Sequence, residues 1–248
     1  MIQRTRPAPR PVDPEVMGLF RRPAFDRVRL LEAADRARRK GRRRRAVRLY
    51  REVLAVEPRN PELNARIAPL LAATGQSFDA WRAYLRAIEH CRAEKQLEAA
   101  VTLARGATRS LPRQIEPWEQ LARLEAGRGR REAAREALRR GRRAMKGRRR
   151  RPQAIALLRL ALELDPDDVQ VTVDLARQLA RSDQTLVALR LLEGLAERCE
   201  GAGRRAARAA QWRIEPSLQN TGAWMHSAWA CWRQGPVRSG ARAPRAAS

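Results

Sequence analysis

The sequence predicts an all-α fold of about eleven to twelve helices arranged as a repeat. Three observations lead to this prediction. Hydrophobic residues make up 44% of the 248 residues but aromatic residues only 4%, so leucine and alanine must fill closely packed helices, and β-branched residues, which favour sheets, are sparse. From Arg27 onward, apolar residues recur at i, i+3, i+4 and i+7. Short segments rich in Gly, Pro, Asp and Ser interrupt this pattern at regular intervals, as helix ends do.

The pattern divides the chain into four parts. Residues 1–24 are rich in Pro and Arg and are expected to form a flexible arm. Residues 25–200 are expected to form the repeat array, and residues 201–234 a pair of capping helices rich in Trp. Residues 235–248 carry no apolar pattern and are expected to be a disordered tail. Within the array, helix ends are expected at 40–43, 57–61, 74–77, 110–117, 127–130, 146–152, 165–168 and 181–184.

A repeat is visible when windows of the chain are aligned. Residues 27–60 and 61–94 match at a period of 34, which pairs Ala46 with Ala80 and Tyr50 with Tyr84. Further matching windows begin at residues 115 and 169. This pattern resembles the tetratricopeptide-repeat (TPR) family, whose unit has W-x2-L-G-x2-Y in its first helix and A-x3-F-x2-A followed by Pro in its second. Alanine replaces the glycine of the first helix, at Ala34, Ala68, Ala122 and Ala176.

The resemblance covers roughly residues 27–200 and implies a right-handed α-solenoid of stacked helix–turn–helix units. Two stretches do not fit one register. Residues 95–111 and 152–164 both read as second helices of a unit, although the helix before each of them already serves as one. Either the array contains two phase slips, or a three-helix unit occurs twice, and the sequence leaves this choice open.

The residues that carry chemistry give no catalytic or metal-binding pattern. His90 and His226 stand far apart, Cys91, Cys199 and Cys231 form no paired motif, and no phosphate-binding glycine loop is present. We therefore expect no enzymatic activity, no cofactor and no metal. Odd, widely spaced cysteines favour a reducing, cytoplasmic location, and no apolar run is long enough for a transmembrane helix. The acidic stretch 163–168 is expected to end one helix at Pro166 and to cap the next with Asp167 or Asp168.

Charge is strongly positive and unevenly distributed. The formal net charge is +26, and residues 1–45 and 123–151 are strongly basic whereas residues 152–200 are acidic on balance. Such a field favours acidic proteins, nucleic acid or anionic surfaces as partners. Two arginine runs in expected turns are basic-patch candidates: Arg42, Arg43, Arg44 and Arg45, and Arg148, Arg149, Arg150 and Arg151. These two runs are either anion-binding sites or solvated turns. Because they have no aromatic neighbour except Tyr50, any contact with nucleic acid would be non-specific and limited to the phosphate backbone.

The TPR resemblance also implies where a peptide would bind. The concave face of such arrays is lined by first-helix positions that correspond here to Arg38, Arg123, Arg177 and Arg181. A groove lined by these arginines suits an acidic or extended peptide. The function we expect is a non-catalytic protein–protein interaction scaffold with an acidic partner; the alternative is non-specific anion or nucleic-acid binding through the arginine-rich turns. The oligomeric state and the partner's identity stay open.

The Trp-rich segment near the C-terminus forms a further candidate. Met225, Trp229 and Trp232 are spaced to share one helical face, and Trp224 stands beside it. This face either caps the array by packing on the preceding helix, or docks a partner or a membrane interface. The sequence leaves both interpretations open.

Overall fold

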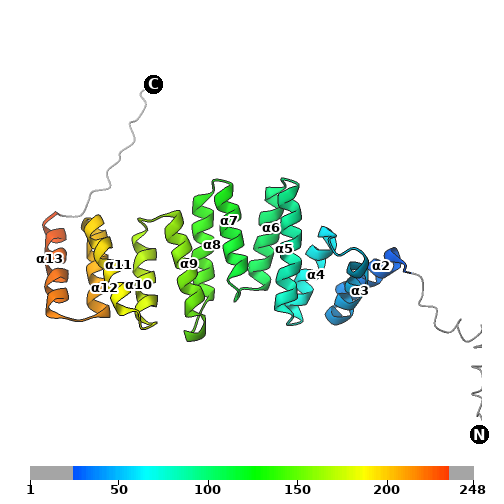
Figure 1. The fold of residues 1–248 in the computed structure, drawn as a ribbon, viewed down its shortest axis with the longest axis horizontal. Helices are drawn as coiled ribbons and strands as arrows, with labels where there is room; N and C mark the ends of the chain where they lie inside the picture. Colours follow the sequence, from blue (N-terminus) through cyan, green and yellow to red (C-terminus); the bar gives the residue numbers. More distant parts are fainter. Residues whose placement is uncertain (1–24, 235–248) are drawn as a thin grey trace, which may run out of the picture.

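The computed structural model describes residues 25–234, and of residues 231–234 the backbone alone. Twelve α-helices and one 3₁₀ turn stack side by side into an elongated array without any strand in this part of the chain (Figure 1). Their bounds are α2 Arg27–Arg39, α3 Arg43–Val56, α4 Pro61–Ala73, α5 Ser77–Ala93, α6 Leu97–Ser110, α7 Glu116–Gly127, α8 Arg131–Ala144, η1 Arg148–Arg150, α9 Arg151–Leu164, α10 Val169–Ala180, α11 Thr185–Arg198, α12 Gly201–Ile214 and α13 Leu218–Gln234. The predicted all-α solenoid is confirmed.

Four helices begin with a capping side chain, and in α13 it is Ser217, whose hydroxyl accepts a hydrogen bond from the Asn220 N–H at 3.1 Å. The carboxylates of Asp26 and Asp168 each accept a hydrogen bond at 3.0 Å from a backbone N–H of the first turn, in α2 and α10 respectively, and the Asn60 amide oxygen accepts one at 3.1 Å in α4. These bonds satisfy backbone donors that have no partner inside the helix. Of the two caps predicted for α10, the structure selects Asp168.

The turns between helices repeat every three helices. Left-handed backbone, at φ between +61° and +84°, follows α4, α7 and α10 at a spacing of 54 residues, at Gly75, Gly129 and Asp183. A second series of left-handed residues, with φ between +55° and +94°, marks the starts of α3, α6, α9 and α12. Gly41, Lys95 and Gly147 precede the first three of these helices, and Gly201 is the first residue of α12. Glycine adopts this conformation without a steric penalty, which explains its prevalence at both kinds of turn.

Helix contacts follow the same period. Each helix packs against the next one, and three helices also reach the next but one: α4 contacts α6, α7 contacts α9, and α10 contacts α12. The helices therefore form three-helix units, α4–α6, α7–α9 and α10–α12, preceded by α2 and α3. Of the two registers that the sequence left open, the structure has the three-helix unit, and α12 supplies a third occurrence.

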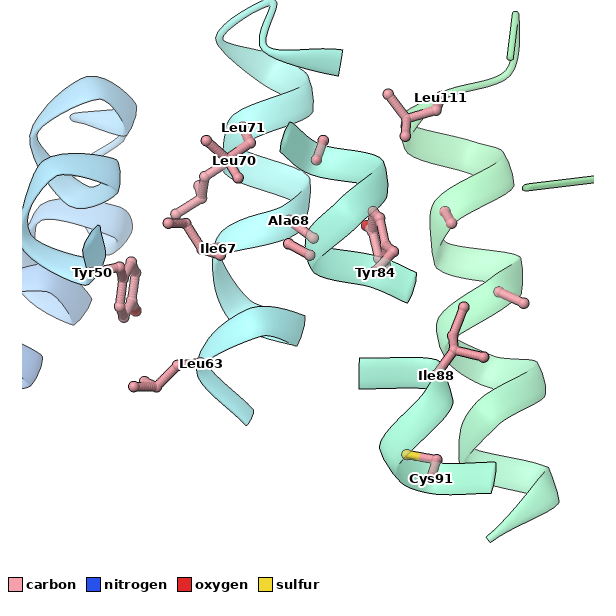
Figure 2. Close-up of a cluster of buried hydrophobic side chains, with 14 of the residues drawn as sticks. Tyr50, Leu63, Ile67, Ala68, Leu70, Leu71, Tyr84, Ile88, Cys91 and Leu111 are labelled. Atoms are coloured by element: carbon pink, nitrogen blue, oxygen red, sulfur yellow. The ribbon is translucent and has the colours of Figure 1, made fainter. Parts of the chain in front are cut away.

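The core consists of the small and aliphatic residues that the repeat predicted. The four first-helix alanines, at positions 34, 68, 122 and 176, are all buried, and so are the second-helix positions Tyr50 and Tyr84. Figure 2 shows Tyr50, Tyr84, Ile67 and Ile88 projecting between neighbouring helices of the N-terminal half. A second cluster continues the core from Trp118 through α12. Small residues let the helices approach closely, and each unit buries its apolar face on its neighbour.

Candidate functional site

The arginines predicted to line the concave face are mostly paired within their own helices. Arg38 lies 3.2 Å from the Asp35 carboxylate, Arg123 lies 3.6 Å from Glu119, and the Arg177 guanidinium lies 3.5 Å from the Asp174 carboxylate. Each acid stands three or four residues before its arginine, on the same helix face. The positive charge at these three positions is therefore partly neutralised, although all three side chains reach solvent.

Asp35 is part of a wider network at the N-terminal end of the array. The buried Tyr50 hydroxyl donates a hydrogen bond to Asp35 at 2.6 Å, and Arg66 of α4 lies 3.3 Å from the same carboxylate. The hydrogen bond from Tyr50 holds the pKa of Asp35 below its usual range, against the opposing effect of burial. Burial in turn raises the pKa of Tyr50. This network joins α2, α3 and α4 and stabilises the array rather than offering a free site.

Arg181, the fourth predicted groove residue, lies one helical turn after Arg177, and its backbone N–H donates to the Arg177 carbonyl at 3.2 Å. It follows the end of α10, and its backbone carbonyl accepts a hydrogen bond from the Arg151 side chain. Arg181 also lines a hollow of about 490 Å³ together with residues of the second arginine-rich turn. The structure thus places Arg181, a predicted groove residue, beside the arginine-rich turn at Arg148–Arg151. No local sequence pattern indicates this proximity.

The arginine-rich turns themselves are solvent-facing. Arg42 to Arg45 are all exposed, as are Arg148 and Arg149, while Arg150 and Arg151 are half-buried. None of these eight arginines makes a salt bridge with a carboxylate of the described residues. Their charge is therefore uncompensated locally, which suits them to bind an external anion.

A pair of grooves that the sequence did not suggest lies between the three-helix units. A hollow of about 380 Å³ is bounded by α3, α4 and α5, and one of about 590 Å³ by α6, α7 and α8. All ten positions that line the first also line the second after a shift of 54 residues, at Arg51, Leu54, Ala55, Asn64, Ile67, Leu71, Asp79, Arg82, Ala83 and Arg86 in the first. The residue type is the same at three of them, where Arg51, Ala83 and Arg86 correspond to Arg105, Ala137 and Arg140. We call these the inter-unit grooves. The 54-residue spacing between windows at 61, 115 and 169 was the signal that could have found them.

Both inter-unit grooves combine an apolar floor with arginine walls. In the first, Arg51 lies 2.7 Å from Asp79, whereas Arg82 and Arg86 have no carboxylate partner within the described part of the chain. In the second, Arg105 lies 2.5 Å from the buried Glu125, and Arg109 has no such partner. Each groove therefore retains positive charge above residues such as Ile67 or Trp118, and can accept a segment with both apolar and acidic side chains.

The C-terminal helix α13 packs on α12 through a different face from the one that the capping interpretation requires. The Trp224 ring stacks on Trp212 of α12 with centroids 5.7 Å apart, and Ser227 is buried. Met225 and Trp229 are 60% and 49% exposed. The side chain of Trp232 lies outside the described residues. The two members of the predicted apolar face whose side chains are described, Met225 and Trp229, are thus largely turned to solvent.

The histidines and cysteines of residues 25–230 are dispersed along the array. No group of three or more His, Cys, Asp or Glu side chains within this range comes together to hold a metal ion. His90 is exposed beside the buried Cys91, and Cys199 is half-buried. None of the helices that the structure describes is both long and apolar enough to cross a bilayer.

Comparison with known proteins adds similarities of fold. No protein-family model matches the chain, and no curated protein matches it in sequence. Among solved structures, MamA from Desulfovibrio magneticus is 19% identical, covers 70% of this chain and 95% of its own, and has a TM-score of 0.25. A tetratricopeptide repeat protein from Parabacteroides merdae is 12% identical, with coverages of 86% and 94% and a TM-score of 0.30. PilF from Pseudomonas aeruginosa is 13% identical, with coverages of 85% and 92% and a TM-score of 0.28.

These similarities concern the fold alone, because all three identities are under 25% and all three TM-scores are low. The TPR-like solenoid follows from the chain's own features: buried alanines at the first-helix positions, buried tyrosines at the second-helix positions, and helix pairs joined by left-handed turns.

Proposed function

We propose that the chain is a non-catalytic, cytoplasmic scaffold that binds an acidic protein or peptide. The observation that supports this proposal is the pair of inter-unit grooves, whose lining positions recur at a spacing of 54 and keep arginine at two of them. A hollow of the same position in the unit is thereby presented twice, with its own set of side chains each time. Arrays of stacked helices commonly offer such extended repeated surfaces to elongated partners.

The chemistry of the grooves suits an amphipathic acidic segment. Apolar side chains of the partner would lie on the floor formed by Ile67 in the first groove or Leu121 in the second. Its carboxylates would meet Arg86 and Arg109, whose guanidinium groups have no carboxylate partner among the described residues. Arginine binds carboxylates through two parallel hydrogen bonds, which adds orientation to the electrostatic attraction. The concave-face arginines Arg38, Arg123 and Arg177 would supply a second contact surface, in which a partner's acid displaces the intrahelical one.

Capture from nuclease-treated lysate with the full chain, followed by mass spectrometry, identifies the partner, and a titration then measures its affinity. The double variant R86E/R109E should weaken binding by about tenfold or more, since it places like charges opposite the partner's acids. The matched control is R92E/R113E, which changes the net charge equally at exposed arginines outside the grooves. Equal losses for both doubles would show that overall charge, rather than the grooves, binds the partner.

The second candidate function is non-specific anion or nucleic-acid binding through the arginine-rich turns. The supporting observation is that Arg42–Arg45 and Arg148–Arg151 have no carboxylate partners in the described structure and border hollows lined by cations. Retention on heparin or DNA should fall when Arg42–Arg45 are changed to Glu while binding of the acidic peptide partner is unchanged. Binding to DNA should also weaken steeply between low and physiological salt. Salt-insensitive, sequence-specific binding would contradict this candidate.

A further inference from the structure

One six-residue sequence occurs twice in the chain. KGRRRR stands at residues 40–45 and again at residues 146–151. The first copy connects α2 to α3 and the second connects α8 to η1 and α9, which are equivalent turns of the three-helix period. In both, the glycine has left-handed backbone, with φ of +68° at Gly41 and +94° at Gly147.

Each copy encloses a basic hollow. The first basic hollow, of about 210 Å³, is lined by Arg36, Lys40, Arg42 and Arg45 together with two alanines. The second, of about 490 Å³, has the same four cations in equivalent places, at Arg142, Lys146, Arg148 and Arg151, and adds Arg143 and Arg181. Within each run, the first and fourth arginines line the hollow, whereas the second and third do not.

The charge in both hollows is nearly free of internal compensation. No carboxylate lines either one. Arg142 lies 2.8 Å from Asp174, and the other contacts of these side chains are to backbone carbonyls: Arg36 donates to the Glu32 carbonyl oxygen and Arg151 to that of Arg181. Several positive charges facing one small space repel each other unless an anion lies between them.

The turn itself does not require these basic residues. The two equivalent turns, before α6 and at the start of α12, keep the left-handed backbone at Lys95 and Gly201. They carry Glu94 and Glu200 where the KGRRRR turns carry lysine. Basic turns therefore alternate with acid-bearing turns of the same backbone geometry, so the arginines are not explained by folding.

We propose that each basic hollow binds one phosphate group of a nucleic-acid backbone; this rests on the second candidate function and gives it defined sites. A phosphate diester suits the hollow because its oxygens accept bidentate hydrogen bonds from several guanidinium groups. No aromatic side chain lines either hollow for base stacking, so the bases are not read. A ligand that fills both hollows carries successive phosphates along its length, as a nucleic-acid strand does.

Position-matched pairs of variants of the full chain test the proposal. K40A/R42A and K146A/R148A remove cations that line the hollows, and R43A/R44A and R149A/R150A remove equal charge from the same runs without touching them. Fluorescence anisotropy with a labelled 40-nucleotide strand, over a series of salt concentrations, gives affinity and salt slope. Each hollow double should lower the affinity about tenfold and reduce the salt slope by about 1–2, whereas the control doubles should change the affinity by less than about threefold.

Equal losses for hollow and control doubles would overturn the proposed sites while leaving diffuse anion binding intact. Absence of nucleic-acid binding by the unchanged chain would overturn the sites and the second candidate function together. A poly-glutamate peptide or phosphatidylserine vesicles that bind as tightly, with the same dependence on the hollow doubles, would also overturn the assignment to nucleic acid.

A gain of binding provides an independent measurement. The double E94K/Q96R installs the basic pattern at the acid-bearing turn before α6. We expect about a threefold or greater rise in affinity and a steeper salt slope. The control E89K/E98Q makes the same change in charge, +3, on either side of that turn. A rise of equal size in this control would count against a role for the turn geometry.

Discussion

The units α4–α6 and α7–α9 place their helices alike but fill their interiors with different side-chain volumes. Asn64 in α4 corresponds to Trp118 in α7, and Ala87 in α5 corresponds to Gly141 in α8, each at a shift of 54 residues. A Cβ added at Gly141 would lie 2.7 Å from Cγ of Trp118. The larger residue on one helix is thus accommodated by the loss of a methyl group on its neighbour. The backbone repeats because the summed volume at this contact is held within limits, not because the residues are the same.

The starts of the same two units differ for a related reason. Asn60 caps α4 by accepting the N–H of Leu63, and Asp168 caps α10 by accepting that of Val171. The position equivalent to this donor in α7 is Pro117, which has no N–H. The hydrogen bond that Asn60 and Asp168 accept therefore has no counterpart at Gln114, and α7 has no side-chain cap in the structure.

The largest effect is expected at Trp118, where the two units differ most. Changing Trp118 to Asn, the residue of the neighbouring unit, removes a buried ring and the hydrogen bond that its indole N–H donates to the Pro112 carbonyl at 3.1 Å. We expect the free energy of unfolding to fall by about 3–5 kcal/mol in urea titrations followed by circular dichroism. Trp212→Asn is the control; because Trp212 is 37% exposed, it should cost less than half as much.

Asp168 should show the next largest effect, with a defined pH dependence. Its side chain is 7% exposed and lies 2.7 Å from Arg139 and 3.1 Å from Arg135. Burial alone would raise the pKa of Asp168, but the Val171 N–H and the two arginines outweigh it and hold the pKa below its usual value. Asp168→Ala should cost about 2–3 kcal/mol at neutral pH, compared with about 1 kcal/mol for Asn60→Ala, which removes an uncharged cap.

A lowered pKa in the folded state means that the stabilisation is complete above the pKa of an unfolded aspartate, about 3.9. It is lost as the pH falls through the lower folded-state pKa. The difference in unfolding free energy between the unchanged chain and Asp168→Ala should therefore shrink below about pH 4. Urea titrations at pH 7, 4 and 2.5 measure it, and a difference that stays constant over this range would contradict the assignment.

Gly141→Ala tests the volume exchange directly. Alone, it should destabilise the chain by about 1–2 kcal/mol, because the clash with Trp118 exceeds the gain in helix propensity. In the Trp118→Asn background the ring is gone, but Cβ of residue 118 and Leu157 Cδ1 still lie 2.9 Å and 3.0 Å from the added methyl group. The same substitution should therefore cost less there, by at least about 0.5 kcal/mol. A double-mutant cycle measures this coupling. Additive effects of the two changes would show that the contact between them does not set the choice of residues.

The smallest effect is expected at Lys95, in one of the turns. Lys95 has left-handed backbone, φ +57°, where the equivalent turns carry glycine. Lys95→Gly should raise the free energy of unfolding by about 0.5–1 kcal/mol, because the steric cost for a side chain slightly exceeds the backbone entropy of glycine. The converse change, Gly129→Ala at φ +73°, should lower it by about 1–2 kcal/mol. Thermal unfolding measures both changes in stability. If both substitutions changed the free energy of unfolding in the same direction, the explanation from left-handed backbone would be contradicted.

Much of the fold could be predicted because its determinants are local. The cap at Asp168, the turn glycines and the buried Tyr50 and Tyr84 all follow from spacing within one or two helices. The three-helix period was harder to predict, since residues 97–110 and 151–164 carry the same apolar pattern as the second helix of a pair. A third helix is distinguished from a phase slip only by its packing on both helices of the preceding pair, as α6 packs on α5 and α4.

The candidate sites were less predictable because they depend on which helices meet. The runs Arg42–Arg45 and Arg148–Arg151 are visible in the sequence, but that their first and fourth members share a hollow with Arg36 or Arg142 is not. Arg181 reaches the second hollow across thirty residues. The acids that pair with Arg38, Arg123 and Arg177 were visible one turn earlier in the sequence, and they reduce the free charge predicted for the concave face.

The contacts between three-helix units have a consequence for how such a chain changes length. Each unit touches its immediate neighbours, and the junction is made by equivalent helices: α6 contacts α7, and α9 contacts α10. A tandem duplication or deletion of 54 codons would therefore leave every remaining junction matched, whereas one of 34 codons would join unlike faces. The molecule can thus lengthen or shorten in whole modules, and its reach along an elongated partner is set in discrete steps.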